Sequence, residues 1–393
     1  MQKYDVAIVG GGAAGLACAL TLGNSGNNLN VIVVEAGERV GRKMAASGNG
    51  QGNISNAEMT PEHFHGGGAS IAEKLCCSGM YDHLKLFDFL FTQDKAGRIY
   101  PAGRQASALS DCLMRKIQAC GVKILLSTKV EKIEKGFVLS LSDGEKISAR
   151  RVVVAAGGKA QKQFFTDGNG YTLAAPFGHT ITPLYPSLVQ LKCDTRHIKT
   201  LKGIRADCKI RAFDQGGNLL GASSGDVIFT DYGISGNAVF YISSFLAGVE
   251  NATVSLEFLP EFTEEEIEKD LENKLKAGYG QSELLSGTLH NQLGRAIIKR
   301  CESGDKRVIA AAVKNFTLRV TGSLGFDYAQ VTKGGLSVDE VDENLQSKLV
   351  KGLYFAGEIL DVDGDCGGYN LTFALCSGIH VATKICGEIN VDD

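Results

Sequence analysis

The sequence predicts an α/β fold in which the two ends of the chain form one domain and the middle forms an inserted module. Short apolar runs rich in β-branched residues, the pattern of buried strands, occur near both ends, at residues 4–9, 152–155 and 352–356. From about residue 187 the pattern changes to alternating strands and charged stretches. A chain of 393 residues is also too long for a single compact core.

The expected domain boundaries lie where these patterns change. Residues 1–186 and 331–393 are expected to form one domain, and residues 187–330 are expected to form the insert. Alternating strands in the first part of the insert indicate a β-barrel. Residues 263–276 begin with a threonine N-cap, continue with acidic residues and end with lysines, an order that suits the helix dipole. A helical part is therefore expected at about 263–310.

The composition excludes several classes of protein. Hydrophobic residues make up 44% and charged residues 22% of the chain, which is unlike a disordered protein. With 41 Lys and Arg against 44 Asp and Glu, the net charge of −3 leaves no basic surplus for binding nucleic acid. No apolar run reaches the roughly 18 residues needed to span a membrane. A small molecule is therefore the expected partner.

The N-terminal residues MQKYDVAIVG lack the charged and apolar regions of a signal peptide. The chain contains eleven cysteines, which would suggest disulfides in a small secreted domain but not in a chain of this length. We therefore expect a cytoplasmic protein with reduced thiols.

Several polar clusters suggest a metal or redox centre, but none completes a known pattern. No two cysteines have the spacing Cys-x-x-Cys, which argues against a zinc ribbon and against a dithiol of the thioredoxin type. The adjacent Cys76 and Cys77 are weak evidence by themselves. An EF-hand loop starting at Asp361 would need Gly at its sixth position and Glu at its twelfth, where the chain has Cys366 and Thr372. His63 and His65 have no further ligand cluster, so a flexible loop is the preferred interpretation and no metal is expected.

The strongest motif is Gly10-x-Gly12-x-x-Gly15, which follows a predicted strand and opens a predicted helix. Gly10 permits the tight turn, Gly12 lets the backbone approach a pyrophosphate at the helix N-terminus, and Gly15 allows close helix packing. Glu35, at the end of the next strand, would accept hydrogen bonds from an adenosine ribose and would repel a 2′-phosphate. This context predicts a Rossmann-type domain that binds FAD or NAD.

Two further segments favour FAD over NAD. The strand at 152–155 is followed by the small residues Ala156, Gly157 and Gly158, where the backbone must pass close to something flat. The strand at 352–356 is followed by Gly357 and Glu358, which resembles the secondary signature of flavoproteins whose FAD lies extended across one Rossmann domain. In that arrangement the acidic residue lies beside the ribityl chain. FAD is therefore the expected cofactor.

Three more segments are expected to lie beside the cofactor. Arg42 and Lys43 could neutralise phosphate, although a solvated surface position is equally compatible with Lys43. The loop 47–50 contains enough glycine to suggest close approach to the flavin. The backbone amides of residues 368–370, before a last helix expected at about 371–386, would stabilise negative charge at the N1 and C2 carbonyl edge of reduced flavin.

The expected cofactor contacts are Gly10, Gly12, Ala13, Ala14, Gly15, Glu35, Ala36, Arg42, Lys43, Ser47, Gly48, Asn49, Gly50, Val130, Ala156, Gly157, Gly158, Gly357, Glu358, Gly368, Tyr369 and Asn370.

Several longer segments of the sequence resemble one family. They are ASGNGQGNISN at 46–56, GRIYP at 97–101, FGHTITPLYPSLV at 177–189, GISG at 233–236, AQVTKGGLS at 329–337 and GLYFAGEILDVDGDCGGYNLTFALCSG at 352–378. On these motifs the chain is similar, from end to end, to the YhiN/BaiN-like FAD-dependent oxidoreductases, which also carry an aminoacetone oxidase label. The resemblance implies an FAD domain of the glutathione-reductase-like Rossmann type, interrupted by an insert with β-barrel and helical parts. The chain departs from the family pattern at 51–53, at 231–232 and at Asn237, all on the expected substrate side.

The expected mechanism follows partly from the absence of a second Gly-x-Gly-x-x-Gly unit, because this leaves no separate nicotinamide domain. We expect transiently bound NADH or NADPH to give a hydride to flavin N5, which passes it to an electron-poor carbon. The resemblance implies reduction of a conjugated C=C (an enone) in a small apolar, possibly steroid or bile-acid-like, substrate. The alternatives are an amine oxidase that passes electrons to oxygen and a non-catalytic FAD sensor. Tyr369 and Tyr232 are the candidate proton donors.

Overall fold

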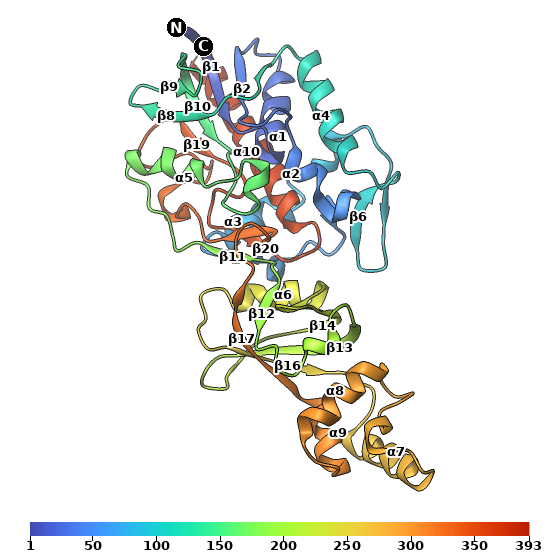
Figure 1. Cartoon of the computed structure of the whole chain (residues 1–393). Helices are drawn as coiled ribbons and strands as arrows, with labels where there is room; N and C mark the ends of the chain where they lie inside the picture. The colour runs from blue at the N-terminus through green and yellow to red at the C-terminus, as the bar shows by residue number, and fades with distance from the viewer. Residues whose placement is uncertain (393) are drawn as a thin grey trace. The chain divides into compact units, whose positions relative to one another are not determined.

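The computed structural model describes residues 1–392, with side chains described through Glu388. The chain divides into two compact units. One consists of residues 1–185 together with the segment from residue 331 onward, and the other consists of residues 186–330. Each unit has its own hydrophobic core. In Figure 1 the two ends of the chain, drawn in blue and red, belong to the same unit.

Five parallel strands form the centre of the first unit, in the order β7-β2-β1-β10-β19. Their bounds are β1 Gln2–Val9, β2 Val31–Val34, β7 Lys123–Leu125, β10 Lys146–Val154 and β19 Leu353–Phe355. Strands β8 (Val130–Glu134) and β9 (Val138–Leu141) extend the sheet in antiparallel pairing beside β10. The apolar runs at the ends of β1, β2 and β10 are buried throughout, as expected for a parallel sheet covered on both faces.

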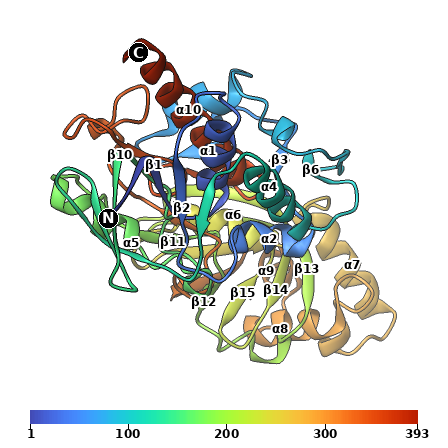
Figure 2. The ribbon, with the colours of Figure 1, turned by 90° about the horizontal axis from the view of Figure 1, so that it is seen from above.

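Helix α1 (Ala13–Gly23) and helix α10 (Tyr369–Asp392) lie side by side in this unit (Figures 1 and 2). The expected last helix begins two residues earlier than predicted, at Tyr369, and continues beyond residue 386. The two helices meet at their backbones, because a Cβ atom added to Gly378 would lie 2.2 Å from the carbonyl oxygen of Ala14. A glycine is therefore required where α10 crosses α1.

Shorter elements complete the first unit. They are α2 Arg42–Ala45, β3 Ser55–Asn56, β4 Phe64–His65, α3 Ala69–Ala72, β5 Phe91–Gln93, β6 Arg98–Pro101, α4 Ser107–Ala119, α5 Asn169–Ala174 and β20 Asp363–Gly364. A π-helical turn, Glu73–Cys77, directly follows α3. Strand β20 pairs with β4, and β3 pairs with β6, so that segments from both ends of the sequence meet. Where the chain passes between the units, β11 (Tyr185–Ser187) pairs with β18 (Val331–Lys333).

The second unit contains a closed barrel with the strand order β12-β15-β14-β13-β16-β17. The strands are β12 Leu191–Cys193, β13 Arg205–Phe213, β14 Leu219–Phe229, β15 Gly233–Ser235, β16 Thr253–Glu257 and β17 Phe316–Ser323. Four helices accompany it: α6 Asn237–Phe245, α7 Glu264–Lys276, α8 Asn291–Cys301 and α9 Lys306–Lys314. Thr263 and Glu266 form a capping box at the start of α7. The predicted fold class, with a barrel and a helical part, is confirmed.

None of the helices in the described part of the chain combines the length and the apolarity needed to cross a membrane.

Two glycines in α10 give a matched test of the backbone contact with α1. Gly378→Ala should lower the free energy of unfolding by about 1–3 kcal/mol, because the added methyl group meets backbone atoms of Ala14 that cannot turn away. Gly387→Ala should raise it by up to about 1 kcal/mol, since an added Cβ there meets no atom within 4 Å. Urea unfolding of the two variants beside the wild type measures both changes. Equal stability of the two variants would show that α1 and α10 do not touch at Gly378.

Candidate functional site

The first part of the site is the loop between β1 and α1. Gly10 has φ +104°, and a Cβ atom there would lie 2.5 Å from the carbonyl oxygen of Ala155. A Cβ at Gly15 would lie 1.9 Å from the carbonyl oxygen of Gly10. At Gly12, by contrast, a Cβ would meet nothing within 4 Å, and no side chain caps the amides that open α1. The loop thus combines tight packing with open, uncapped amides, which is the arrangement that binds an anion at a helix N-terminus.

Glu35 at the end of β2 holds this loop in place. Its Oε2 atom accepts a hydrogen bond from the Gly11 amide and its Oε1 atom accepts one from the Gly37 amide, both at 2.7 Å. Burial raises the pKa of Glu35, although the two amide hydrogen bonds oppose the shift. The expected contact with an adenosine ribose stays a prediction. It is compatible with the structure because a carboxylate has further lone pairs available.

Two expected cofactor residues from opposite ends of the chain form an ion pair. Lys43 Nζ lies 2.6 Å from Glu358 Oε2, and Glu358 Oε1 accepts a hydrogen bond from the Thr332 amide at 2.9 Å. The other expected phosphate ligand, Arg42, places its guanidinium 5.1 Å from the centre of the Phe165 ring. The structure therefore pairs Lys43 with Glu358, and Arg42 stacks on an aromatic ring.

Three more of the expected cofactor residues, two glycines and Val130, lie in the same unit. Gly157 has φ +73°, and a Cβ there would approach only the methyl group of Thr166, at 3.2 Å. Gly357 has φ +76°, and its added Cβ would lie 2.8 Å from the Cβ of Ala14. Val130 is buried in β8, where its carbonyl oxygen accepts a hydrogen bond from Asn169.

The loop 47–50 contains three consecutive residues with positive φ. Asn49 has φ +55°, which is uncommon for a residue other than glycine, and Gly48 and Gly50 flank it. The hydroxyl of Ser47 is buried and has no hydrogen-bond partner among the described residues. An added Cβ at Gly50 would meet nothing within 4 Å. An unpartnered hydroxyl beside open space is what a loop that contacts a cofactor would present.

The N-terminus of α10 is held by contacts with its surroundings. Gly368 has φ +105°, and a Cβ there would lie 2.4 Å from the Ser55 carbonyl oxygen. The Asn370 side chain accepts from the Gly364 amide at 2.8 Å and donates to the Gly364 carbonyl at 2.7 Å. The buried ring of Tyr369 stacks on His63, with 4.3 Å between the ring centres.

His63 and His65 share one carboxylate. His63 Nδ1 lies 2.9 Å from Asp365 Oδ2, and His65 Nε2 lies 2.9 Å from Asp365 Oδ1. The hydrogen bond to Asp365 is the largest effect that raises the pKa of His65. The interpretation of these histidines as part of a flexible loop is wrong, because pairing of β4 with β20 brings them to Asp365. No group of three or more potential metal ligands was found in the described part of the chain.

Asp363 is a residue that the sequence interpretation missed. It is only 1% exposed, and neither carboxylate oxygen has a hydrogen-bond partner among the described residues. Burial raises its pKa to about 6, with Asp361 and Asp365 adding to the shift and Lys333 and His65 opposing it. The acidic run 361–365 was visible in the sequence, but nothing in it distinguished the paired Asp365 from the unpaired Asp363.

The second candidate proton donor, Tyr232, lies in the inserted unit between β14 and β15. Its side chain is half-buried and its carbonyl oxygen accepts a hydrogen bond from the Cys193 amide at 3.0 Å. Tyr369 lies in the unit that contains the expected cofactor residues, and Tyr232 lies in the other unit.

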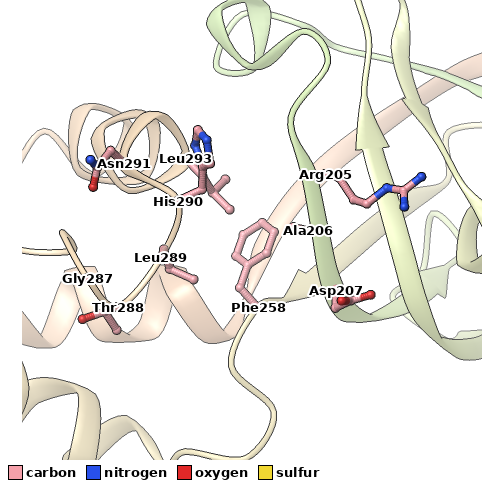
Figure 3. Close-up of a pocket in the computed structure, with 10 residues that line it drawn as sticks. All are labelled: Arg205, Ala206, Asp207, Phe258, Gly287, Thr288, Leu289, His290, Asn291 and Leu293. Carbon is pink, nitrogen blue, oxygen red and sulfur yellow. The ribbon is translucent and has the colours of Figure 1, made fainter.

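The inserted unit also contains a pocket of about 650 Å³, shown in Figure 3. It lies between β13, Phe258 and the segment that leads into α8. The lining residues are Arg205, Ala206, Asp207, Phe258, Gly287, Thr288, Leu289, His290, Asn291 and Leu293. Its charged and polar groups take part in local structure: Arg205 pairs with Asp226 at 3.4 Å, and His290 caps α8. None of the expected site residues lines it.

The Rossmann sheet, the uncapped amides at Gly12 and the unpartnered Ser47 hydroxyl all fit a bound FAD. Together, fold and site define an FAD-dependent oxidoreductase. The chain belongs to the HI0933-like family, since the model of the HI0933-like protein Rossmann domain matches residues 4–384. The family resemblance seen in the sequence is thereby confirmed.

Similar proteins with curated functions cover nearly the whole chain. The chain is 34% identical to the 3-dehydro-bile acid delta(4,6)-reductase of Clostridium scindens, covering 98% of this chain and 99% of the relative. It is 27% identical to the ribosomal RNA dihydrouridine synthase of Escherichia coli, covering 96% of both chains. Among solved structures, an E. coli quinol fumarate reductase aligns with a TM-score of 0.51 and 14% identity, covering 100% of this chain and 72% of the other. The structural likeness supports the fold alone.

The unpaired carboxylate of Asp363 predicts a pH-dependent stability. Between about pH 4 and pH 6 the folded protein should bind a proton at Asp363 that the unfolded chain has already released, so stability contributed by this group falls as pH rises. Asp363→Asn should therefore raise the free energy of unfolding by about 2–3 kcal/mol at pH 8 and leave it nearly unchanged at about pH 4. Urea unfolding of flavin-free protein at both pH values measures the difference.

The control for this experiment is Asp111→Asn, which alters an exposed carboxylate in α4 and should change stability little at either pH. A loss of stability in Asp363→Asn at pH 8 would mean that the native structure depends on the negative charge at this position.

Proposed function

We propose that the protein uses NADH or NADPH to reduce a C=C bond conjugated to a carbonyl group in a small apolar substrate, such as a 3-keto steroid or bile acid. The observation that carries this proposal is the 34% identity over nearly the full chain to a relative named as a 3-dehydro-bile acid delta(4,6)-reductase. The uncapped amides at the start of α1 and the glycines of the Rossmann unit support the same class of chemistry, because they fit a bound FAD.

The more distant relatives are compatible with this reaction class. A dihydrouridine synthase, by its name, saturates the C=C bond of uracil, and that bond is also conjugated to a carbonyl group. The relatives thus share an electron-poor C=C bond as the reacting group, although their substrates differ greatly in size and charge. The net charge of −3 favours the small apolar substrate over ribosomal RNA for this chain.

Different residues of the chain would bind different parts of FAD. The loop at Gly10–Gly15 would bind the pyrophosphate, Glu35 the adenosine ribose, and Glu358, held by Lys43, the ribityl chain. The amides of residues 368–370 would stabilise negative charge at the edge of the ring system. When bound, FAD would supply a centre that takes up a hydride from the nicotinamide and delivers it to the substrate carbon.

Reduction of a conjugated C=C bond also requires a proton at the carbon next to the carbonyl group. Tyr369 is the favoured donor, because its ring lies at the N-terminus of α10 and stacks on His63. His63 is in turn held by Asp365 through Nδ1 at 2.9 Å, which fixes the ring on which the tyrosine stacks. Tyr232 in the inserted unit is the second candidate.

Anaerobic mixing of the FAD-loaded protein with single reductants tests the proposal. NADH or NADPH should bleach the flavin absorbance, and a bile acid with a 3-keto group conjugated to a C=C bond should then restore it. The saturated 3-keto bile acid is the matched control and should leave the flavin bleached, because it offers no C=C bond to reduce.

The other outcomes separate the alternatives. Bleaching of the flavin absorbance by an amine, followed by recovery of that absorbance when oxygen is admitted, would support an amine oxidase. Recovery of the flavin absorbance when ribosomal RNA is added, accompanied by formation of dihydrouridine, would support an RNA-modifying enzyme. Retention of FAD without bleaching by any donor would support a non-catalytic sensor, and each of these results would overturn the proposal.

Tyr369→Phe tests the proton donor because it removes only the hydroxyl group. Reoxidation of the bleached flavin by the enone should slow by about 100-fold, while bleaching by the nicotinamide should keep its rate, since only the reduction of the enone needs the proton. Stopped-flow absorbance measures both rates. A comparable loss in Tyr232→Phe instead would assign the proton to the inserted unit, and unchanged rates in both variants would exclude a tyrosine donor.

A further inference from the structure

An exposed phenylalanine in the first unit has no role in the reaction proposed above. Phe165 directly follows the short helical turn Lys162–Phe164, and it is 46% exposed. Its φ of +65° is uncommon for a residue with a bulky side chain. Backbone in this conformation costs free energy and is found disproportionately at sites that bind ligands. Phe165 is therefore a candidate for a ligand contact.

The loop that carries Phe165 is held in place by polar contacts on its C-terminal side. Asp167 Oδ2 pairs with Lys129 Nζ at a distance of 2.6 Å. The side chain of Asn169 donates a hydrogen bond to the carbonyl oxygen of Val130 at 2.9 Å. These two contacts join the loop to the segment that leads into β8.

The segment before β8 is in turn joined to the end of β2. The Thr128 amide donates a hydrogen bond to the Glu35 carbonyl oxygen at 3.0 Å, and the Ser127 amide donates one to the Gly37 carbonyl oxygen at 2.9 Å. Phe165 thus belongs to the same part of the unit as Glu35, the residue expected to bind the adenosine ribose.

Gly37 is the point at which Phe165 and Glu35 come together. A Cβ atom added to Gly37 would lie 3.0 Å from Glu35 Oε1 and 3.1 Å from Phe165 Cδ2. The amide of the same glycine donates a hydrogen bond to Glu35 Oε1 at 2.7 Å. Because the carboxylate and the aromatic ring approach one glycine, a ribose held by the carboxylate would lie close to the ring.

Arg42 adds a positive charge beside the same ring. Its guanidinium lies 5.1 Å from the centre of the Phe165 ring and 5.8 Å from the centre of the Phe164 ring, and both contacts favour a cation. Burial raises the pKa of Glu35, and Arg42 is among the groups that oppose this shift. The guanidinium is therefore held by aromatic rings within electrostatic reach of the Glu35 carboxylate.

We propose that Phe165 contacts the adenosine end of FAD and holds Arg42 toward the phosphate next to the adenosine ribose. An aromatic ring can stack on an adenine base, a carboxylate accepts hydrogen bonds from ribose hydroxyls, and a guanidinium suits a phosphate. The proposal rests on the part of the proposed function that concerns FAD binding, and it does not depend on hydride transfer to an enone.

A fluorescent reporter at this position tests the contact. The chain contains no tryptophan, so Phe165→Trp places a single one in the loop. ADP is the probe, because it carries the adenosine and phosphates of FAD without a flavin ring that would quench tryptophan from a distance. ADP added to the flavin-free full-length variant should quench the tryptophan emission in a saturable manner. Inorganic pyrophosphate, which lacks the adenosine, should leave the emission unchanged.

The matched control is Phe262→Trp, because Phe262 is also 46% exposed but lies in the inserted unit. ADP should leave the emission of this variant unchanged. If its tryptophan responded to ADP as strongly as that of Phe165→Trp, the quenching would not report a contact in the loop and the proposal would fall.

Binding of ADP to flavin-free protein in equilibrium dialysis measures what the ring contributes. Phe165→Ala should weaken ADP binding about tenfold, because it removes the stacking surface. Phe165→Tyr keeps the ring and should stay within about twofold of the wild type, as should Phe262→Ala. Wild-type affinity in Phe165→Ala would overturn the proposal.

The FAD-loaded protein distinguishes FAD from a nicotinamide nucleotide, whose adenosine has the same chemistry. If FAD fills the site, ADP binding that depends on Phe165 should be lost once the wild type is loaded with FAD. Persistence of this binding in the loaded protein would assign the site to the nicotinamide nucleotide and overturn the proposal.

Two further outcomes separate this proposal from the assignment of FAD itself. Binding of ADP to the Phe165→Trp variant without any change in its emission would overturn the contact and leave FAD binding intact. Failure of the flavin-free wild type to bind either ADP or FAD would overturn the assignment of the cofactor, and the proposed contact with it.

Discussion

The first unit depends on a contact between backbones in which no side chain intervenes. Helix α10, from the end of the chain, crosses helix α1, from its beginning, at Gly378, and the nearest atom is the carbonyl oxygen of Ala14. Gly357 meets the side chain of the same alanine from the loop after β19. Ala14 lies in the first turn of α1. These contacts therefore connect the glycine loop between β1 and α1 to the C-terminal segment that supplies Glu358 and the amides near Tyr369.

Three of the buried or half-buried carboxylates in the C-terminal segment have different electrostatic environments. Glu358 is neutralised by Lys43, Asp365 is held between two imidazoles, and Asp363 has no partner among the described residues. Burial of an unpaired carboxylate is costly, and proteins tolerate it mainly where function requires it. The positions of these charges around the N-terminus of α10 are consistent with a site where charge and protons must be controlled.

Helix α10 makes polar contacts at two places along its length. Its first turn includes residues expected to hold the cofactor, and Cys376, further along the same helix, contacts His83. Thr372 lies between these regions and contacts both His83 and Ser55.

Local patterns in the sequence were enough to predict the fold class, the glycine loop before α1 and the barrel of the insert. The spacing of apolar residues and the content of glycine are properties of residues that are close in the sequence. A strand that ends at Gly10 can therefore be recognised without knowing which strands pair with it. The same patterns could not show that His63 and His65 share Asp365, that the Asp363 carboxylate has no hydrogen-bond partner among the described residues, or that Cys376 contacts His83. The residues in these contacts are far apart in the sequence, and it is the pairing of β4 with β20 and the packing of α10 against residues 83–86 that bring them together. The sequence thus determined which elements form and the class of cofactor they suit, whereas the tertiary structure decided which charges and polar groups face each other, because such contacts depend on long-range packing.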